Sequence, residues 1–362
     1  MRPERRYRAW DWRLLATTAA LSLASACASG GGPYDAISLV DDLHPVALDQ
    51  TSGTTDDLHA VSAVTRDIVW AISRTGTFTV TTNAGETWRV GRIAGADTLD
   101  LRAVYGLSNV TAFVLSTGRG RRSQLLRTDD GGETWKLTYV NVDQPVEWKS
   151  VRFWNPLRGV AVGHGRSREL LTMSTRDGGV SWNRVPMLQL PPTLDTERAP
   201  ADGAISFVSG RSGRAWLGTS QRRVMRSTGY GTKWKASFIP IKVDDTSGVV
   251  TLAFRDKDRG IAIGMPTSSP TDTVIAITAD GGATWIERGP KPPIGVVLAA
   301  AYVPEISRMS VVAVGPNGAA YSRNNGATWT QINARAYNAV AFMGRKSGWA
   351  VGPGGRITKI EF

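Results

Sequence analysis

Apolar and polar residues alternate in short runs along most of this chain, and the runs recur at regular intervals. Alternation with a period of two indicates strands that bury one face. The first run of each unit covers residues 58–64, 101–107, 148–154, 202–208, 249–255, 296–302 and 337–343. A second run follows at residues 68–73, 111–116, 158–163, 213–218, 259–264, 309–315 and 347–352. The pattern predicts seven repeated units, each of which begins with two strands.

Five units also contain a motif of eight residues: Ser or Thr first, Asp or Asn third, Gly fifth, a second hydroxyl residue seventh and Trp last. A sixth, divergent copy at residues 227–234 has Gly229 in place of the acid. Asp and Asn accept hydrogen bonds from turn amides, Gly adopts a positive φ, and Trp buries a large ring between units. We therefore predict a structural hairpin, not catalytic acids, at Asn83, Trp88, Asp130, Trp135, Asp177, Trp182, Trp234, Asp280, Trp285, Asn324 and Trp329.

The motif tryptophans lie 44 to 52 residues apart, which with four short strands per unit is typical of a propeller blade. The seventh unit ends one strand short, because only residues 353–362 follow its second run. We expect the segment at 44–50 to supply the missing outer strand and remove the open edges of the ring. The predicted fold is all-β, a seven-bladed β-propeller of four-stranded blades over residues 44–362, closed by an N-terminal strand.

The N-terminal region differs from the repeats. A basic start is followed by 13 apolar residues at 14–26, fewer than the ~20 that a spanning helix needs. Residues 1–26 are therefore predicted to be an export signal. Cys27 follows this stretch, as the lipidated cysteine does in bacterial lipoproteins, but the residue three places before it is Ala24, and Leu23 stands one place too early. Two alternatives therefore stay open: lipidation of Cys27, or ordinary cleavage after Ala26 that leaves Cys27 as a free thiol. Residues 27–43 are predicted to be a tether, and the expected location is the periplasmic face of a membrane.

The amino-acid composition limits the partners, metals and cofactors that can be expected. The net charge of +12, from 43 basic and 31 acidic residues, favours an acidic partner or an anionic surface. One cysteine excludes an internal disulfide framework, and three histidines leave little room for a metal site, so no metal is expected. The paired glycines belong to hairpins and not to a dinucleotide-binding strand–helix unit, so no cofactor is expected. Without a recognisable nucleic-acid module, nucleic acid is not an expected partner either.

Residues 45–362 resemble the Asp-box (BNR) repeat propellers, and more closely exported bacterial relatives of the photosystem II stability/assembly factor family. The resemblance is carried by TDDGGETW at 128–135, by the repeated second strands and by GWAVGPGGRITK at 348–359. It implies a seven-bladed propeller on the lumenal side of a photosynthetic membrane that binds reaction-centre polypeptides through an arginine-rich surface. Some relatives are called oxidoreductases or glycosyl hydrolases, but this chain contains no motif that supports either activity.

Arginines are concentrated between the second and third strands of the second, third and fourth units. The matching position of the first unit holds Arg74, whereas the fifth and sixth units have no cation there. Because these loops share one face of a propeller, we predict a docking patch for acidic protein or lipid; solvated loop cations are the alternative. His164 is expected to be a loop residue and not a ligand. The predicted partner-binding residues are Arg119, Arg121, Arg122, Arg166, Arg168, Arg222 and Arg223.

The preferred function is a non-enzymatic, membrane-extrinsic scaffold or assembly subunit that docks on a membrane protein complex, and the resemblance points to a photosynthetic reaction centre. The alternative is a secreted glycan-active or glycan-binding propeller. Sialidases need an Arg-Ile-Pro motif, which the chain lacks, and a pair of acids such as Asp202 and Asp256 is weak support for a glycosidase. An aromatic-lined cleft with two or three converging acids at the propeller axis would favour the enzyme.

Overall fold

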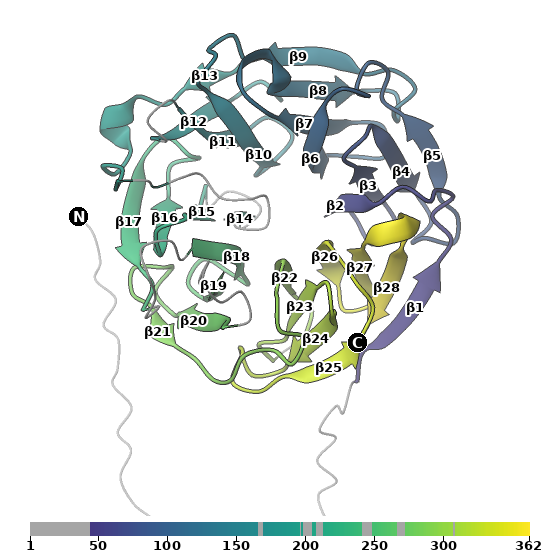
Figure 1. The fold of residues 1–362 in the computed structure, drawn as a ribbon, viewed down its shortest axis with the longest axis vertical. Helices are drawn as coiled ribbons and strands as arrows, with labels where there is room; N and C mark the ends of the chain where they lie inside the picture. Colours follow the sequence, from purple (N-terminus) through teal and green to yellow (C-terminus); the bar gives the residue numbers. More distant parts are fainter. Residues whose placement is uncertain are drawn as a thin grey trace, which may run out of the picture. The chain divides into compact units, whose positions relative to one another are not determined.

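The computed structural model describes residues 44–165, 169–195, 197, 205–207, 213–240, 248–265, 272–306 and 308–362. Their 28 strands form seven four-stranded antiparallel sheets, which follow one another around a ring (Figure 1). The predicted all-β, seven-bladed propeller is confirmed. The predicted signal peptide, the tether and Cys27 lie outside the described residues.

Each blade runs from an inner to an outer strand in chain order. Blades 1 to 3 consist of β2 (Leu58–Ala63), β3 (Val69–Ser73), β4 (Thr77–Thr81) and β5 (Arg89–Arg92); β6 (Asp100–Gly106), β7 (Ala112–Thr117), β8 (Gln124–Thr128) and β9 (Lys136–Val140); and β10 (Glu147–Phe153), β11 (Gly159–His164), β12 (Leu170–Thr175) and β13 (Asn183–Arg184).

Blades 4 to 6 continue the order. They consist of β14 (Ile205–Phe207), β15 (Ala215–Gly218), β16 (Arg223–Ser227) and β17 (Trp234–Phe238); β18 (Gly248–Phe254), β19 (Gly260–Met265), β20 (Val274–Thr278) and β21 (Ile286–Glu287); and β22 (Ala299–Tyr302), β23 (Val311–Gly315), β24 (Gly318–Ser322) and β25 (Thr330–Asn333).

Blade 7 closes the ring as predicted. Its own strands are β26 (Ala339–Gly344), β27 (Ser347–Val351) and β28 (Ile357–Glu361), and β1 (Val46–Gln50) pairs antiparallel with β28 as the outer strand. The side chain of Gln50 strengthens the closure: its Oε1 accepts hydrogen bonds of 3.2 Å from the indole N–H groups of Trp349 in blade 7 and Trp88 in blade 1. The two ends of the chain are thus joined by main-chain and side-chain bonds.

The core lies between adjacent blades, where apolar residues of the strands meet. The motif tryptophans contribute: the ring of Trp135 lies 5.7 Å from that of Phe78 in the preceding blade. The most deeply buried tryptophans are others, however, namely Trp70, Trp148, Trp216 and Trp349, three of which are on second strands. The motif therefore accounts for only part of the packing between blades.

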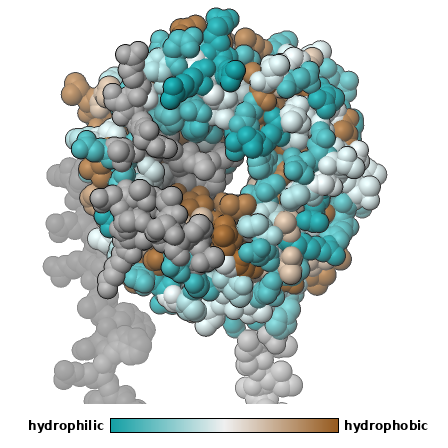
Figure 2. All heavy atoms as spheres, in the orientation of Figure 1, coloured by the Kyte–Doolittle hydropathy of each residue, from teal (hydrophilic) through white to brown (hydrophobic). Residues whose placement is uncertain are grey.

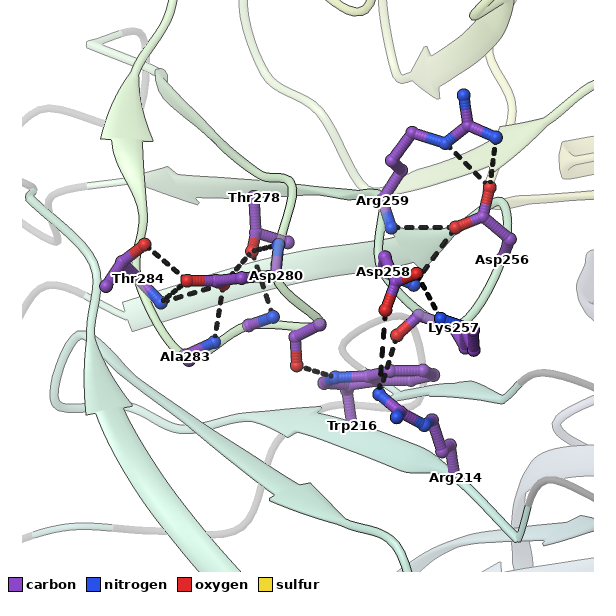
Figure 3. Close-up of polar contacts among 12 residues, drawn as sticks. Arg214, Trp216, Asp256, Lys257, Asp258, Arg259, Thr278, Asp280, Ala283 and Thr284 are labelled. Carbon is purple, nitrogen blue, oxygen red and sulfur yellow. Dashed lines mark hydrogen bonds and ion pairs between the residues drawn. The ribbon is translucent and has the colours of Figure 1, made fainter.

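The Asp-box hairpins join the third and fourth strands. In blade 5, the Thr278 hydroxyl donates to Asp280 at 2.8 Å and accepts from the amide of Gly282 at 2.9 Å (Figure 3). Thr284 donates to the same carboxylate through its hydroxyl, at 2.6 Å, and through its amide, at 2.9 Å. Gly281 and Gly282 both have positive φ, 72° and 80°. Every polar position of the motif thus has a partner inside the hairpin.

The carboxylate of Asp280 is held in its ionised form. Partial burial opposes ionisation, but the hydrogen bonds from Thr284 and Thr278 outweigh it and lower the pKa to about 2. At Asp177 the bonds from Ser181 likewise lower the pKa to about 2. Boxes 1 and 6 have Asn83 and Asn324 at this position, and the Oδ1 atom of each accepts from the amide of a following Thr, at 3.0 and 2.9 Å. In these boxes the position supplies an acceptor, and a charge is not required.

We expect Asp280→Ala to lower the free energy of unfolding by about 1 kcal/mol, because several turn donors lose their acceptor. Asp280→Asn keeps the acceptor and is expected to cost less. Because the folded pKa lies below the unfolded value, the stabilisation by Asp280 is present above about pH 4 and is lost as the pH falls towards 2. Urea unfolding between pH 2 and 6 measures this. Equal losses for Ala and Asn, or an unchanged acid slope in the Asn variant, would contradict the assignment.

Candidate functional site

The seven loops between second and third strands lie on one face of the propeller, together with the connections from each outer strand to the next inner strand. This follows from the antiparallel order of every blade, which sends alternate turns to opposite faces. We call it the loop face. The Asp-box hairpins and the turns between first and second strands lie on the other face, the box face. The predicted arginines that the structure describes, in blades 2 and 4, thus belong to the loop face.

The loop of blade 2 presents three arginines on a fixed backbone. The 3-10 turn η1 (Gly120–Arg122) follows Gly118, and both glycines have positive φ, 60° and 128°. The Ser123 hydroxyl donates to the carbonyl of Gly118 at 2.6 Å, and the fully buried Asn141 side chain donates to those of Asp143 and Val146 in the next connection. The loop and this connection are joined by a bond from the Gly120 amide to Val146.

Arg119, Arg121 and Arg122 are exposed on this turn. Within the described residues, none of the three lies within 4.0 Å of a carboxylate. Arg74, in the matching loop of blade 1, differs: it forms two hydrogen bonds to Asp100, of 2.7 and 2.8 Å. The three arginines of this turn are therefore available to an external anion.

Arg223 was expected in the same patch, and this expectation is wrong. Its side chain is buried, and its guanidinium forms an ion pair of 2.8 Å with Glu197, which is 1% exposed. The neighbouring Arg222 is half-buried with φ of 57°. Arg166 and Arg168, the candidates in blade 3, lie outside the described residues. The sequence alone does not distinguish an exposed arginine in a loop from a buried arginine at the start of a third strand, such as Arg223.

Charges also line part of the central channel. Half-exposed positions of β6 and β10 carry Asp100, Arg102, Glu147, Lys149 and Arg152, whereas those of β18 and β22 carry Val250, Ala300 and Ala301. Figure 2 shows hydrophilic residues near β6 and hydrophobic residues near β18 and β22 around the central opening. The channel is thus polar on one side and apolar on the other.

The two channel carboxylates are poorly suited to acid–base catalysis. Burial opposes ionisation of Asp100, but hydrogen bonds from Arg74 and Arg102 hold its pKa below the usual value. Burial likewise opposes ionisation of Glu147, whose pKa Lys149 and Thr117 lower. A general acid must carry a proton near neutral pH, and these groups do not. His164, at the end of β11, lies with Nε2 3.5 Å from Glu147.

Other acids give no stronger candidate. Asp256 is bound to Arg259 at 2.7 Å on the box face (Figure 3), and Asp202 lies outside the described residues. A groove of about 780 Å³ at the ring closure is lined by residues 49–55 and 353–357; its acid, Asp49, accepts a bond from Thr358 and pairs with Arg335. In the part of the chain that the structure covers, no three His, Cys, Asp or Glu side chains are grouped to hold a metal.

Several solved structures have a fold similar to that of this chain. No protein-family model and no curated protein matches the chain. A solved structure described as YCF48 bound to D1 peptide is 15% identical, with a TM-score of 0.61 over 88% of this chain and 97% of that one. YCF48 from Cyanidioschyzon merolae is 16% identical, with a TM-score of 0.64 over 87% and 98%. An ancestral GH74 enzyme is 14% identical, with a TM-score of 0.64 over 86% of this chain and 46% of that chain.

These similarities confirm the resemblance to the assembly-factor propellers at the level of the fold. The YCF48 structures are matched over nearly their whole length. The GH74 enzyme is matched over less than half of its length. At these identities the shared feature is the architecture, and a propeller hosts many functions.

An exposed apolar turn between blades 3 and 4 was not predicted from the sequence. The connection after β13 contains the 3-10 turn η2 (Met187–Gln189), whose Met187 and Leu188 are exposed. It lies on the loop face, as the arginine loop of blade 2 does. Residues 187–190 read Met-Leu-Gln-Leu between Pro186 and Pro191, an apolar run where a connection is ordinarily polar. That composition was the available signal.

Proposed function

We propose that this chain is a non-enzymatic, membrane-extrinsic scaffold or assembly subunit that docks on a membrane protein complex through its loop face. The observation that carries the proposal is the exposed arginine turn of blade 2, whose three guanidinium groups have no carboxylate of the described chain beside them. Guanidinium groups form paired hydrogen bonds with carboxylates, so an acidic polypeptide segment fits this surface.

The choice of partner rests on the comparisons. A structure with the same fold and size is described as YCF48 bound to D1 peptide, which supports a polypeptide ligand for this architecture. We propose a reaction-centre polypeptide as the partner of this chain. The glycan-active alternative is less well supported, because the channel acids Asp100 and Glu147 are both paired with cations.

We also propose that the protein is exported and anchored by a lipid on Cys27, at the periplasmic face of a membrane. This part rests on the N-terminal sequence, which lies outside the described residues. No helix in the described part of the chain has the length and the apolar run that a membrane crossing requires. Fatty-acid labelling of the parent chain, absent from Cys27→Ser, tests the anchor.

Charge reversal tests the docking surface. We expect Arg119→Glu, Arg121→Glu and Arg122→Glu together to weaken association with the membrane complex by about tenfold or more at low salt. The loss should shrink at high salt, because counterions screen exposed charges. Stability should change little, since the three side chains are exposed. Co-purification from gently solubilised native membranes across a salt series measures the effect.

The matched control reverses three exposed cations of the box face: Arg176 in the hairpin of blade 3, and Arg345 and Lys346 in a turn of blade 7. Neither set has a described carboxylate within ion-pair distance, and both change the net charge by the same amount. Equal losses from both sets would mean that only net charge matters. No loss from either would remove the blade 2 turn from the docking surface.

A further inference from the structure

The turn η2 exposes two consecutive large apolar side chains. Leu188 is 100% exposed and Met187 is 60% exposed. Single exposed apolar residues are ordinary on a protein surface, but a pair at the tip of one turn is not required by the fold of the blade. The neighbouring Leu190 is only half exposed and packs against the core cluster between blades 3 and 4. The turn therefore has a buried base and an apolar tip.

Hydrogen bonds on both sides of η2 fix the position of the turn that carries Met187 and Leu188. The Val185 amide donates to Thr172 of β12 at 2.8 Å, and the amides of Gln189 and Leu190 close the turn onto Pro186 and Met187. On the far side of the turn, the buried Arg223 donates to the carbonyl of Pro192 and to Glu197. The carboxylate of Glu197 also accepts from the Leu194 amide. The exposure of Leu188 is thus a property of a braced turn.

The arginine turn of blade 2 is connected to this tip through the residues between them. Arg184, at the end of β13, pairs with Asp143 in the connection from blade 2 to blade 3. The same connection bonds to η1 through Asn141 and Gly120. It also exposes Val142, which is 67% exposed. The arginine turn, Val142 and the tip of η2 therefore follow one another along the loop face from blade 2 to blade 3.

We propose that this rim, formed by the arginine turn, Val142 and the tip of η2, contacts the surface of an anionic lipid bilayer. Apolar side chains enter the region between head groups and acyl chains, while guanidinium groups bind phosphates. The shape favours a bilayer over a protein. Protein interfaces concentrate their energy in pockets that receive an anchor, whereas a bilayer accepts a protruding tip without a matching surface. The proposal uses the same arginine turn as the proposed docking surface but needs lipid alone as the ligand, so vesicles without protein test it separately.

A single fluorescent probe tests the contact in the full chain. Cys27 is the only cysteine, so Cys27→Ser with Leu188→Cys gives one labelling site for an environment-sensitive dye. On vesicles of equal parts phosphatidylglycerol and phosphatidylcholine, we expect the emission to move to shorter wavelength. Adding Arg119→Gln, Arg121→Gln and Arg122→Gln should raise the lipid concentration needed for half of this shift by roughly ten- to a hundredfold at low salt.

The control places the dye at Val180→Cys in the box hairpin of the same blade, where the side chain is 69% exposed on the opposite face. Its emission should not change, even if the N-terminal segment binds the vesicle, because that anchor is common to both chains. Equal shifts at both positions, or none at position 188, would overturn the proposal. So would a shift at position 188 that appears only when solubilised membrane complex replaces the vesicles. None of these outcomes affects the test of the protein partner.

Discussion

Replacement of Trp216 by alanine is expected to lower the free energy of unfolding by about 3–5 kcal/mol. Trp216 lies on the second strand of blade 4, is 1% exposed and stacks on Phe254 of blade 5 with ring centroids 3.6 Å apart. Its indole N–H donates to the carbonyl of Gly281, in the box hairpin of blade 5, at 2.8 Å (Figure 3). The substitution removes one of the two tryptophans packed between the two blades and leaves a buried acceptor without its donor.

Trp216→Phe separates the two contributions. It retains an aromatic ring against Phe254 but loses the bond to Gly281, so we expect a cost of about 1–2 kcal/mol. Chemical unfolding of each variant, followed by far-ultraviolet circular dichroism, gives the two values. A cost below about 1 kcal/mol for the alanine variant would show that blades 4 and 5 are held together mainly by other contacts.

The same bond recurs at other blade junctions, which explains why second-strand tryptophans matter. Trp70 of blade 1 donates to the carbonyl of Ser108 in blade 2 at 2.9 Å. Trp349 of blade 7 donates to Gln50, which also binds Trp88 of blade 1. These tryptophans lie within the alternating strands of the sequence, but their partners are 38 residues away for Trp70 and 299 for Trp349. Periodicity therefore identified the strands and not the junctions.

The repeated hairpins could be predicted because their hydrogen bonds are local. Each box closes on itself within eight residues, as Asp280 with Thr278 and Thr284 illustrates, so residue types and spacing specify the turn. The closure could be predicted as well, since a blade that lacks an outer strand leaves an open edge. The segment 44–50 was expected to fill it, and β1 begins at Val46.

The site was harder to predict because exposure depends on tertiary context. Arg121 and Arg223 occupy corresponding regions of two blades, yet one is exposed on η1 and the other is paired with Glu197. The difference arises from Pro192 and Glu197, two residues of the connection between blades 3 and 4, which accept hydrogen bonds from Arg223 of β16. No local pattern identifies that carboxylate. The presence of arginines in these loops was predictable, whereas their roles were not.

Loss of the buried ion pair has the second large effect. We expect Arg223→Ala to lower the free energy of unfolding by about 3–5 kcal/mol, because it leaves Glu197 charged and buried without its counterion. Pro192 also loses a donor to its carbonyl. The matched control is Arg222→Ala, one residue earlier and half-buried, with an expected cost below about 1 kcal/mol. Chemical unfolding measures both.

The double variant Arg223→Met, Glu197→Leu distinguishes an electrostatic pair from simple packing. Replacing both members with apolar residues removes the uncompensated charge, so the double variant should be more stable than either single one. Because the pair braces the connection that carries η2, Arg223→Ala should also accelerate amide exchange of Gln189 and Leu190, whose amides close the turn. If the losses of unfolding free energy in the two single variants add up to the loss in the double variant, Arg223 and Glu197 are not a coupled pair. Unchanged exchange at those two amides would show that the exposed tip of Leu188 is held out by the turn itself and does not depend on Arg223.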